Sequence, residues 1–197
     1  QDLEAAVVQL KARAIQRKFE ETFISGDSGI DPKAFDGIET LTPAGQTVSM
    51  GANGGTLTLA KLDELIDAVK GGKPDLLLMS RRARRVLNGL ACTGGPFLET
   101  DRHEFGQMVS VYDGIPIGVS DFIPDDQVVG SSTDCTTIYA MRLGEGGLAG
   151  LTSPGGLQVE RVGSLETRDA TRTRVKWYVS LALFNTVKIA KLVGVRP

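Results

Sequence analysis

The chain has 197 residues, of which 41% are hydrophobic and 23% are charged, and its formal net charge at pH 7 is −2. This composition predicts one large folded domain or two small ones and argues against disorder. The near-neutral charge argues against strong binding of nucleic acid by the chain as a whole. No apolar run approaches the roughly 20 residues of a membrane span. The cysteines, Cys92 and Cys135, lack metal-ligand spacing and are interpreted as reduced, inert thiols.

A long helix is predicted at the start of the chain, from Asp2 to about Ile24. Its apolar residues recur at three- and four-residue steps, no Pro or Gly interrupts it, and strong helix formers fill the other positions. At ~1.5 Å per residue the helix is on the order of 35 Å long. Gly26 is expected to end it in the left-handed conformation. Because the chain starts with Gln1-Asp2-Leu3 and not with an initiator Met or a signal peptide, we expect upstream residues to be missing.

Short strands and two amphipathic helices are predicted for the middle of the chain. The first helix runs from Leu59 to Val69 with Thr56 or Thr58 as its N-cap, and the second follows Ser80, which caps it. Between the helices, a continuous apolar stretch at 75–79 is typical of a strand buried on both faces. The remaining segments are a strand at 46–50 and loops, rich in Gly, Pro and short polar residues, at 27–32, 51–55 and 89–101.

From residue 107 the apolar period changes to two, which predicts strands. Asp113-Gly114 is read as a hairpin turn, and Pro116 argues that the second strand of this hairpin has an unpaired side or a bulge. Residues 125–136 are predicted as a polar loop, and 144–156 as a loop because six glycines and a proline disfavour regular structure. The predicted strands are 108–112, 115–119, 137–143, 157–162, 172–179 and 187–193, the fourth and fifth forming a long strand pair that is polar on one face.

The order of these elements is a helix, then mixed strands and helices, then strands, which is an α+β pattern. The long N-terminal helix cannot bury its apolar stripe alone, and the late strand pair is the only other long element. We therefore expect the helix and the strand pair to pack together as one elongated unit, and the middle of the chain to form a second, compact unit.

Several segments, in this order and spacing, make the sequence similar to one family. They are residues 19–27 at the end of the long helix, the helix–strand–helix from 59 to 90 with Leu76-Leu77-Leu78-Met79-Ser80-Arg81-Arg82, Tyr112-Asp113-Gly114-Ile115-Pro116-Ile117, Asp121-Phe122-Ile123-Pro124, and the final pair 174–184 and 187–193. Over nearly its whole length the chain resembles the major capsid proteins of tailed phages, which have the Hong Kong 97-type fold and are related to encapsulins.

The resemblance implies a division into two domains. Residues 1–36 and 150–183 would form the peripheral domain, in which a long spine helix packs on a long β-hairpin. Residues 37–149 and 184–197 would form a compact, mixed α/β axial domain. The N-terminal arm and the extended loop that family members carry before the spine helix have no counterpart here, which agrees with the expectation of missing residues.

The resemblance also implies a structural function without an enzymatic step. Copies would assemble through pentamers and hexamers into an icosahedral shell that encloses double-stranded DNA without sequence-specific binding. The protein would be part of the virion, after assembly in the host cytoplasm, with a scaffolding protein, a maturation protease and a portal as further partners and no membrane. An encapsulin-like compartment, which encloses cargo enzymes, is the alternative within the fold.

The residues themselves give little support to catalysis. His103 is the only histidine and is interpreted as a solvated loop residue, since neither Cys92 nor any serine lies in a nucleophile motif. No catalytic residue, cofactor site or metal site is predicted. Gly51–Gly55 precedes a helix and leaves open a small phosphate-ligand enzyme. A flexible connector is favoured, because the segment lacks the Walker-type Gly-Lys-Ser/Thr and the GxGxxG spacing.

The most concentrated charge in the sequence is the arginine cluster of the second amphipathic helix: Arg81, Arg82, Arg84 and Arg85. A solvated helix face is the simplest interpretation of such a run. Arginines also form bidentate pairs with carboxylates across subunit interfaces, whereas phosphate-backbone binding is weakly supported because no aromatic residues are interleaved. We favour a subunit interface and take the four arginines as its candidate residues.

Overall fold

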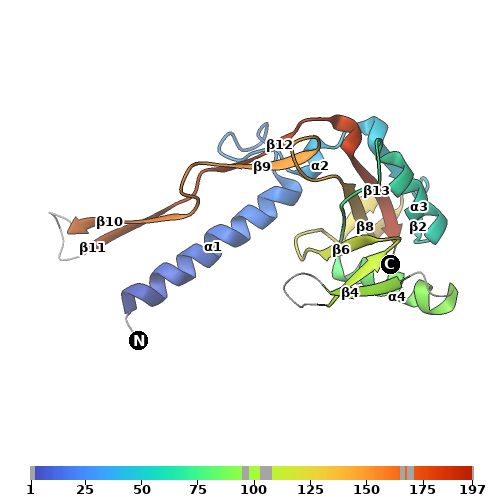
Figure 1. Cartoon of the computed structure of the whole chain (residues 1–197), viewed down its shortest axis with the longest axis horizontal. Helices are drawn as coiled ribbons and strands as arrows, with labels where there is room; N and C mark the ends of the chain where they lie inside the picture. Colours follow the sequence, from blue (N-terminus) through green and yellow to red (C-terminus); the bar gives the residue numbers. More distant parts are fainter. Residues whose placement is uncertain (1–2, 95–97, 103–107, 165–166, 168–170, 197) are drawn as a thin grey trace. The chain divides into compact units, whose positions relative to one another are not determined.

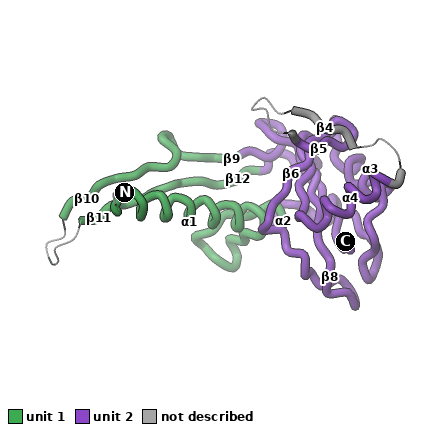
Figure 2. Tube along the Cα trace, turned by 90° about the horizontal axis from the view of Figure 1, so that it is seen from below, with its two compact units in different colours: residues 1–38, 150–182 green, residues 39–149, 183–197 purple. Residues whose placement is uncertain are grey.

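The computed structural model describes residues 3–94, 98–102, 108–164, 167 and 171–196, and the chain divides into two compact units (Figures 1 and 2). Unit 1 contains residues 1–38 and 150–182, and unit 2 contains residues 39–149 and 183–197. The predicted α+β class, with a long N-terminal helix and a mixed sheet, is confirmed. In the described part of the chain, no helix is long and apolar enough to cross a lipid bilayer.

Unit 1 is built on α1 (Leu3–Ser25), which confirms the predicted long helix. Strands β10 (Gln158–Ser164) and β11 (Thr171–Lys176) form the antiparallel ribbon that the alternating sequence predicts. β11 lies against α1, and both views place the ribbon beside the N-terminal half of the helix (Figures 1 and 2). A second two-stranded ribbon pairs β9 (Leu148–Thr152) with β12 (Val179–Leu183).

Two sets of contacts hold the ribbon to α1. Near the start of the helix, the Glu4 carboxylate accepts hydrogen bonds from Arg161 Nη2 and from Thr173 Oγ1, each at 3.0 Å. Near its other end, the Phe19 ring lies 4.8 Å from the ring of Trp177, just after β11, and 5.7 Å from that of Phe35. The helix and the ribbon are therefore in contact and belong to the same compact unit.

The C-terminal end of α1 is fixed by close approach of the backbone. A Cβ on Gly26 would lie 2.5 Å from the Thr22 carbonyl oxygen, and one on Gly37 would lie 2.6 Å from the same atom. The Gly37 amide donates to the Gly26 carbonyl at 2.9 Å. The prediction of a left-handed Gly26 is wrong, because its φ is not positive. A glycine is therefore required at position 26 because there is no room for a Cβ, and not because of a positive φ.

Unit 2 contains a nine-stranded mixed sheet with α3 (Leu59–Ala68) and α4 (Arg81–Gly94). Short segments α2 (Ile38–Leu41) and the 3₁₀ turns Ala44–Gln46 and Thr186–Lys188 connect its elements. The strand order is β1 (Thr47–Ser49), β13 (Ile189–Arg196), β8 (Ser132–Met141), β3 (Leu76–Met79), β6 (Ile115–Val119), β5 (Met108–Tyr112) and β4 (Leu98–Arg102), while β2 (Gly55–Thr56) pairs with β13 and β7 (Gln127–Val129) with β8.

The core of unit 2 explains why the β3 sequence is continuously apolar. β3 is a central strand between antiparallel β8 and parallel β6, and Leu77 and Met79 are fully buried. The inner faces of both helices join them, with Leu62 and Leu65 from α3 and Leu87 from α4 in the same cluster. Thr58 caps α3 by accepting a hydrogen bond from the Lys61 amide, so the second of the two predicted N-caps is the one used.

Three predicted loops contain regular structure. The 125–136 loop holds β7 and the start of β8, the 144–156 loop holds β9, and the 89–101 loop is replaced by the last turns of α4 and by β4. These segments are polar or glycine-rich, and partner strands supply the pairing that their composition does not favour. The expected effect of Pro116 is not seen: β6 pairs with β5 at Pro116 and with β3 from the next residue, Ile117, and neither ladder has a shift in register.

Two tyrosines of unit 2 are buried, and removal of their hydroxyls is expected to change the free energy of unfolding in opposite directions. Burial raises the pKa of each, and the Tyr112 hydroxyl also donates to the Asp63 carboxylate at 2.8 Å, whereas the fully buried Tyr139 hydroxyl bonds to no described residue. We expect Tyr112→Phe to lower the free energy of unfolding by about 1 kcal/mol, and Tyr139→Phe to raise it by about 1 kcal/mol because an unsatisfied group is removed. Urea denaturation of both variants measures this, and equal losses would contradict the assignment.

Candidate subunit-interface site

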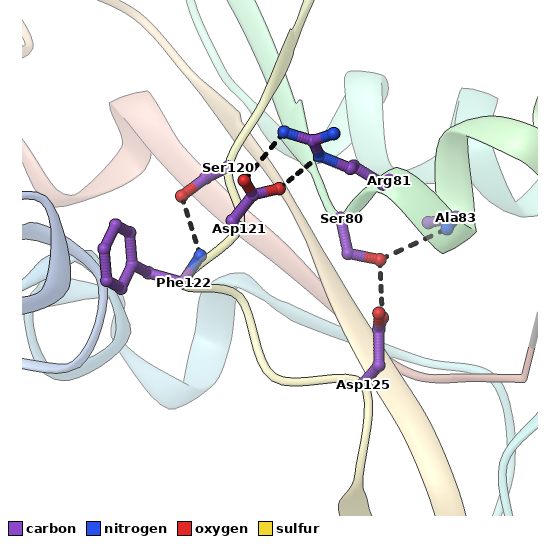
Figure 3. A network of polar contacts seen from close by, with 7 residues as sticks. All are labelled: Ser80, Arg81, Ala83, Ser120, Asp121, Phe122 and Asp125. Carbon is purple, nitrogen blue, oxygen red and sulfur yellow. Dashed lines mark hydrogen bonds and ion pairs between the residues drawn. The ribbon is translucent and has the colours of Figure 1, made fainter.

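The arginine cluster lies at the start of α4, and the sheet explains what surrounds it. β3 and β6 are parallel, so the residues that follow them emerge at the same edge of the sheet. The Ser120 amide after β6 donates to the Met79 carbonyl at the end of β3, at 3.1 Å. The segment 120–125 therefore runs beside the first turn of α4 (Figure 3).

Ser80 joins the helix to this segment. Its hydroxyl accepts a hydrogen bond from the Ala83 amide at 3.2 Å, which confirms the predicted N-cap. The same hydroxyl donates to the Asp125 carboxylate at 2.5 Å, and Ser80 is buried (Figure 3). The cap and the segment after β6 are thus fixed to one another.

The first two arginines of the cluster bind within the chain. The Arg81 guanidinium pairs with both carboxylate oxygens of Asp121, with 2.8 Å between Nη2 and Oδ2 (Figure 3). The hydrogen bond to Asp121, and then its charge, raise the pKa of Arg81 above its ordinary value. Arg82 Nη1 donates to the Asp125 carbonyl at 3.2 Å. Both side chains therefore fasten α4 to the segment after β6.

The last two arginines of the cluster, Arg84 and Arg85, differ from the first two. Arg84 and Arg85 are exposed, and the guanidinium of neither forms a hydrogen bond or ion pair with a residue whose side chain the structure describes. Ala83 and Leu87 of the same helix are fully buried, so the exposed arginines lie on the face turned away from the core. Of the four predicted residues, these two are the ones with a free guanidinium for another molecule.

Sequence reasoning missed the partners of Arg81 and Arg82. Asp121 is 40 residues away from Arg81, and Asp125, in the adjacent pair Asp125-Asp126, reads as ordinary surface charge. The one available signal is that an apolar strand at 76–79 precedes the arginines and another at 115–119 precedes Asp121 and Asp125. Parallel pairing of those strands would place the two groups together, but the sequence does not specify that pairing.

The glycine segment 51–55 is not an open phosphate cradle. The Gly51 amide donates to Ser49 Oγ at 3.1 Å, and the Gly54 amide donates to the Gly51 carbonyl at 3.2 Å. Asn53 Oδ1 accepts from the Ser131 amide at 3.1 Å, which braces the turn between β7 and β8. The segment ends in strand β2, whose pairing with β13 precedes the start of α3. The Gly51 and Gly54 amides thus serve the fold of unit 2.

The other reactive side chains do not form a site in the described residues. Cys135 is buried and Cys92 is exposed, both as free thiols. His103 lies outside the described residues. Within the part of the chain that the structure describes, no group of three His, Cys, Asp or Glu side chains could hold a metal ion.

Comparisons with known proteins agree on one family and one fold. A protein-family model described as "SU10 major capsid protein" matches residues 2–195. None of the curated proteins matches the sequence. Among solved structures, the SrpI encapsulin of Synechococcus elongatus is similar with a TM-score of 0.81 and 24% identity, over 100% of this chain and 67% of that chain.

Two capsid structures are similar at lower identity. The capsid of an empty GTA particle matches with a TM-score of 0.65 and 16% identity, over 98% of this chain and 67% of that chain. The capsid of the Myoviridae phage XM1 matches with a TM-score of 0.60 and 16% identity, over 99% of this chain and 66% of that chain. The chain thus spans about two thirds of the length of these proteins, and the expected Hong Kong 97-type fold is confirmed.

Proposed function

The chain belongs to the SU10 major capsid protein family, and we propose that it assembles through pentamers and hexamers into an icosahedral shell that encloses double-stranded DNA. As a member of this family it is a structural, non-enzymatic capsid component of virions that self-assembles. The family match over residues 2–195 is the observation that carries the proposal. A phosphate-ligand enzyme is not supported, because the family is structural and the amides of Gly51 and Gly54 are already hydrogen-bonded within the chain.

The two units supply the parts that such a shell needs. We assign unit 1 to the peripheral domain, because a long helix with an attached ribbon gives an extended surface for neighbouring copies. We assign unit 2, with its nine-stranded sheet, to the axial domain at capsomer centres. Many modest contacts suffice for closure, since each subunit makes several linked contacts and linkage raises effective concentration.

The charge of the chain suits a genome container without sequence-specific binding. The net charge of −2 gives no strong attraction to the phosphate backbone, so DNA could be packed and released without being held by the wall. The proposal includes assembly in the host cytoplasm with a scaffolding protein, a maturation protease and a portal.

An encapsulin-like compartment is the second candidate, because the similarity to the SrpI encapsulin extends over the whole of this chain with a TM-score of 0.81. Electron microscopy of purified, nuclease-treated particles separates the two functions. Closed particles with protected DNA are expected; closed particles with a protein cargo and no DNA would support the compartment instead. A protein that forms neither particles nor capsomers under any condition would overturn both.

The exposed arginines of α4 provide a direct test of the proposed interface. We expect the double variant R84E/R85E to raise the protein concentration needed for assembly by about tenfold, since two free cations would become repulsive anions at the contact. The matched variant R81E should instead lower thermal stability slightly, because its partner Asp121 is in the same chain. Light scattering measures assembly and thermal denaturation measures folding. Normal assembly of R84E/R85E would exclude these residues from the interface.

A further inference from the structure

Charge in unit 1 is divided between two ends of α1. The basic end consists of residues 3–17 of α1 with β10 and β11, and it carries seven cationic side chains and two carboxylates. The acidic end consists of residues 18–36, and it carries five carboxylates and two lysines. Because α1 is one continuous helix on the order of 35 Å long, these opposite charges are separated along a rigid element.

Only two of the seven cations of the basic end have a carboxylate partner among the described residues. Its two carboxylates are occupied, since Glu4 binds Arg161 and Glu160 pairs with Lys176, which lowers the pKa of Glu160. The Arg172 guanidinium forms no hydrogen bond or ion pair with a described residue, and Arg174 stands opposite the already paired Glu160.

The register of the ribbon places these cations on one face. Thr171, Thr173 and Val175 line a cavity against α1, so the alternating residues Arg172, Arg174 and Lys176 lie on the other face of β11. Glu160, which stands opposite Arg174, is the carboxylate of the described ribbon on this face, so the face carries a net positive charge.

The carboxylates of the acidic end mostly bind backbone amides and not cations. Asp27 accepts from the Gly29 amide at 2.8 Å, Asp31 from the Lys33 amide at 3.0 Å, and Asp36 from the Ser28 amide at 2.8 Å. The bond from Ser28 lowers the pKa of Asp36, which keeps that carboxylate charged. Glu21 alone among the five has a lysine partner, Lys18. The loop therefore presents its negative charge to solvent, beside Ile30, which is 84% exposed.

We propose that the basic face of β10 and β11 in one copy binds the acidic end, residues 18–36, of a second copy. Within one copy, Arg172 and Arg174 lie on the face of β11 turned away from α1, and no carboxylate of residues 18–36 pairs with them. The charges of the basic face and the acidic end are complementary, which makes a contact between copies favourable and steers its formation. The inference rests on the proposed shell function, and it names which surfaces of unit 1 face one another.

Such a contact joins two different surfaces and is therefore heterologous. Heterologous contacts repeat head to tail and generate rings when the rotation between copies closes. The proposed pentamers and hexamers are rings of this kind. The charge polarity of unit 1 thus also sets a direction around the ring, since each copy offers one basic face and one acidic end.

A charge-swap experiment tests the contact. The variant R172E/R174E makes the basic face of β10 and β11 acidic, and E20K/E21K reverses the net charge of the acidic end. The aspartates are left unchanged because they hold the turns of the loop. We expect each variant alone to need about tenfold more protein to assemble than the wild type. An equimolar mixture of the two should assemble at a lower protein concentration than either variant alone, since alternating copies join opposite charges at every contact of a hexamer and at all but one contact of a pentamer.

The controls separate this contact from folding and from the proposed function. Thermal denaturation and the fluorescence of Trp177, the single tryptophan, verify that each variant is folded. If the wild type assembles and both variants assemble equally well alone, the contact is wrong and the shell function stands. If both variants fail and their mixture also fails, charge complementarity is wrong. A wild-type chain that forms no higher-order species overturns the shell function and the contact together.

Discussion

Replacing Gly26 with alanine is expected to destabilise unit 1 by about 3 kcal/mol, near the upper end of what one added methyl group costs. The added Cβ would lie against the carbonyl oxygens of Phe35 and Thr22, the latter at 2.5 Å. These are backbone atoms, so rotation of a side chain cannot relieve the overlap. Either α1 or the loop that follows it has to move.

Gly37→Ala should have an effect of the same size for the same reason. Its Cβ would lie 2.6 Å from the Thr22 carbonyl oxygen and 2.7 Å from the Gly26 amide nitrogen. Neither glycine has a positive φ, so the loss would come from overlap and not from an unfavourable dihedral angle. The double variant should cost less than the sum of the two, because both methyl groups displace the same backbone segment.

Urea denaturation followed by the fluorescence of Trp177 measures this effect inside unit 1. Gly150→Ala is the matched control: this residue belongs to the same unit, its φ is not positive, and a Cβ there would meet nothing within 4 Å. The control should shift the free energy of unfolding by less than about 0.5 kcal/mol. Equal effects at Gly26 and Gly150 would show that the close approach at the end of α1 is wrong.

The long elements could be predicted because their apolar period repeats many times. The steps of three and four in α1 and the alternation in β10 and β11 leave little choice of secondary structure. Exposure could not be predicted in the same way. Leu3 and Leu10 continue the apolar stripe of α1, yet they are 79% and 64% exposed, because the ribbon covers only part of the helix. The spacing of these apolar residues predicts a helix, but which of them are buried depends on the segments that pack against it.

Strand β9 shows where local composition misleads. Its sequence, Leu148–Thr152, contains Gly150 and lies between glycine-rich stretches, and this local composition disfavours a strand. The strand forms because β12, almost 30 residues later in the chain, pairs with it. The first half of β8 is a similar case, since β7 and β13 pair with residues that read as polar loop. Such strands depend on long-range pairing that a single sequence does not reveal.

The candidate interface, too, could be predicted from the sequence only in part. The positions of all four arginines on one helix followed from the sequence, and so did the Ser80 cap. Which arginines are free did not follow, because it depends on the parallel pairing of β3 with β6. That pairing brings Asp121 and Asp125 to the first turn of α4 and engages Arg81 and Arg82, while Arg84 and Arg85, one turn further along, remain available.

Phe19→Ala is expected to destabilise unit 1 by about 2 kcal/mol, less than a fully buried phenylalanine would because this ring is half-buried. Phe19 contacts three aromatic rings, with centroid distances of 6.2 Å to Phe23, 5.7 Å to Phe35 and 4.8 Å to Trp177. It joins the helix, the loop after it and the end of β11. Its removal leaves these segments without their common neighbour.

The fluorescence of Trp177 reports this loss directly. Water should reach the indole face that Phe19 covers, so the emission maximum of the native Phe19→Ala variant should move to longer wavelength at the same time as the midpoint in urea falls. Phe19→Leu should retain much of the packing and show a smaller change in both quantities. Phe23→Ala, which removes a ring in contact with Phe19 at 6.2 Å, should shift the emission little. If the emission of Phe19→Ala matched that of the wild type, Phe19 and Trp177 would not be in contact, and the ribbon would be held to α1 by Glu4 without the aromatic cluster.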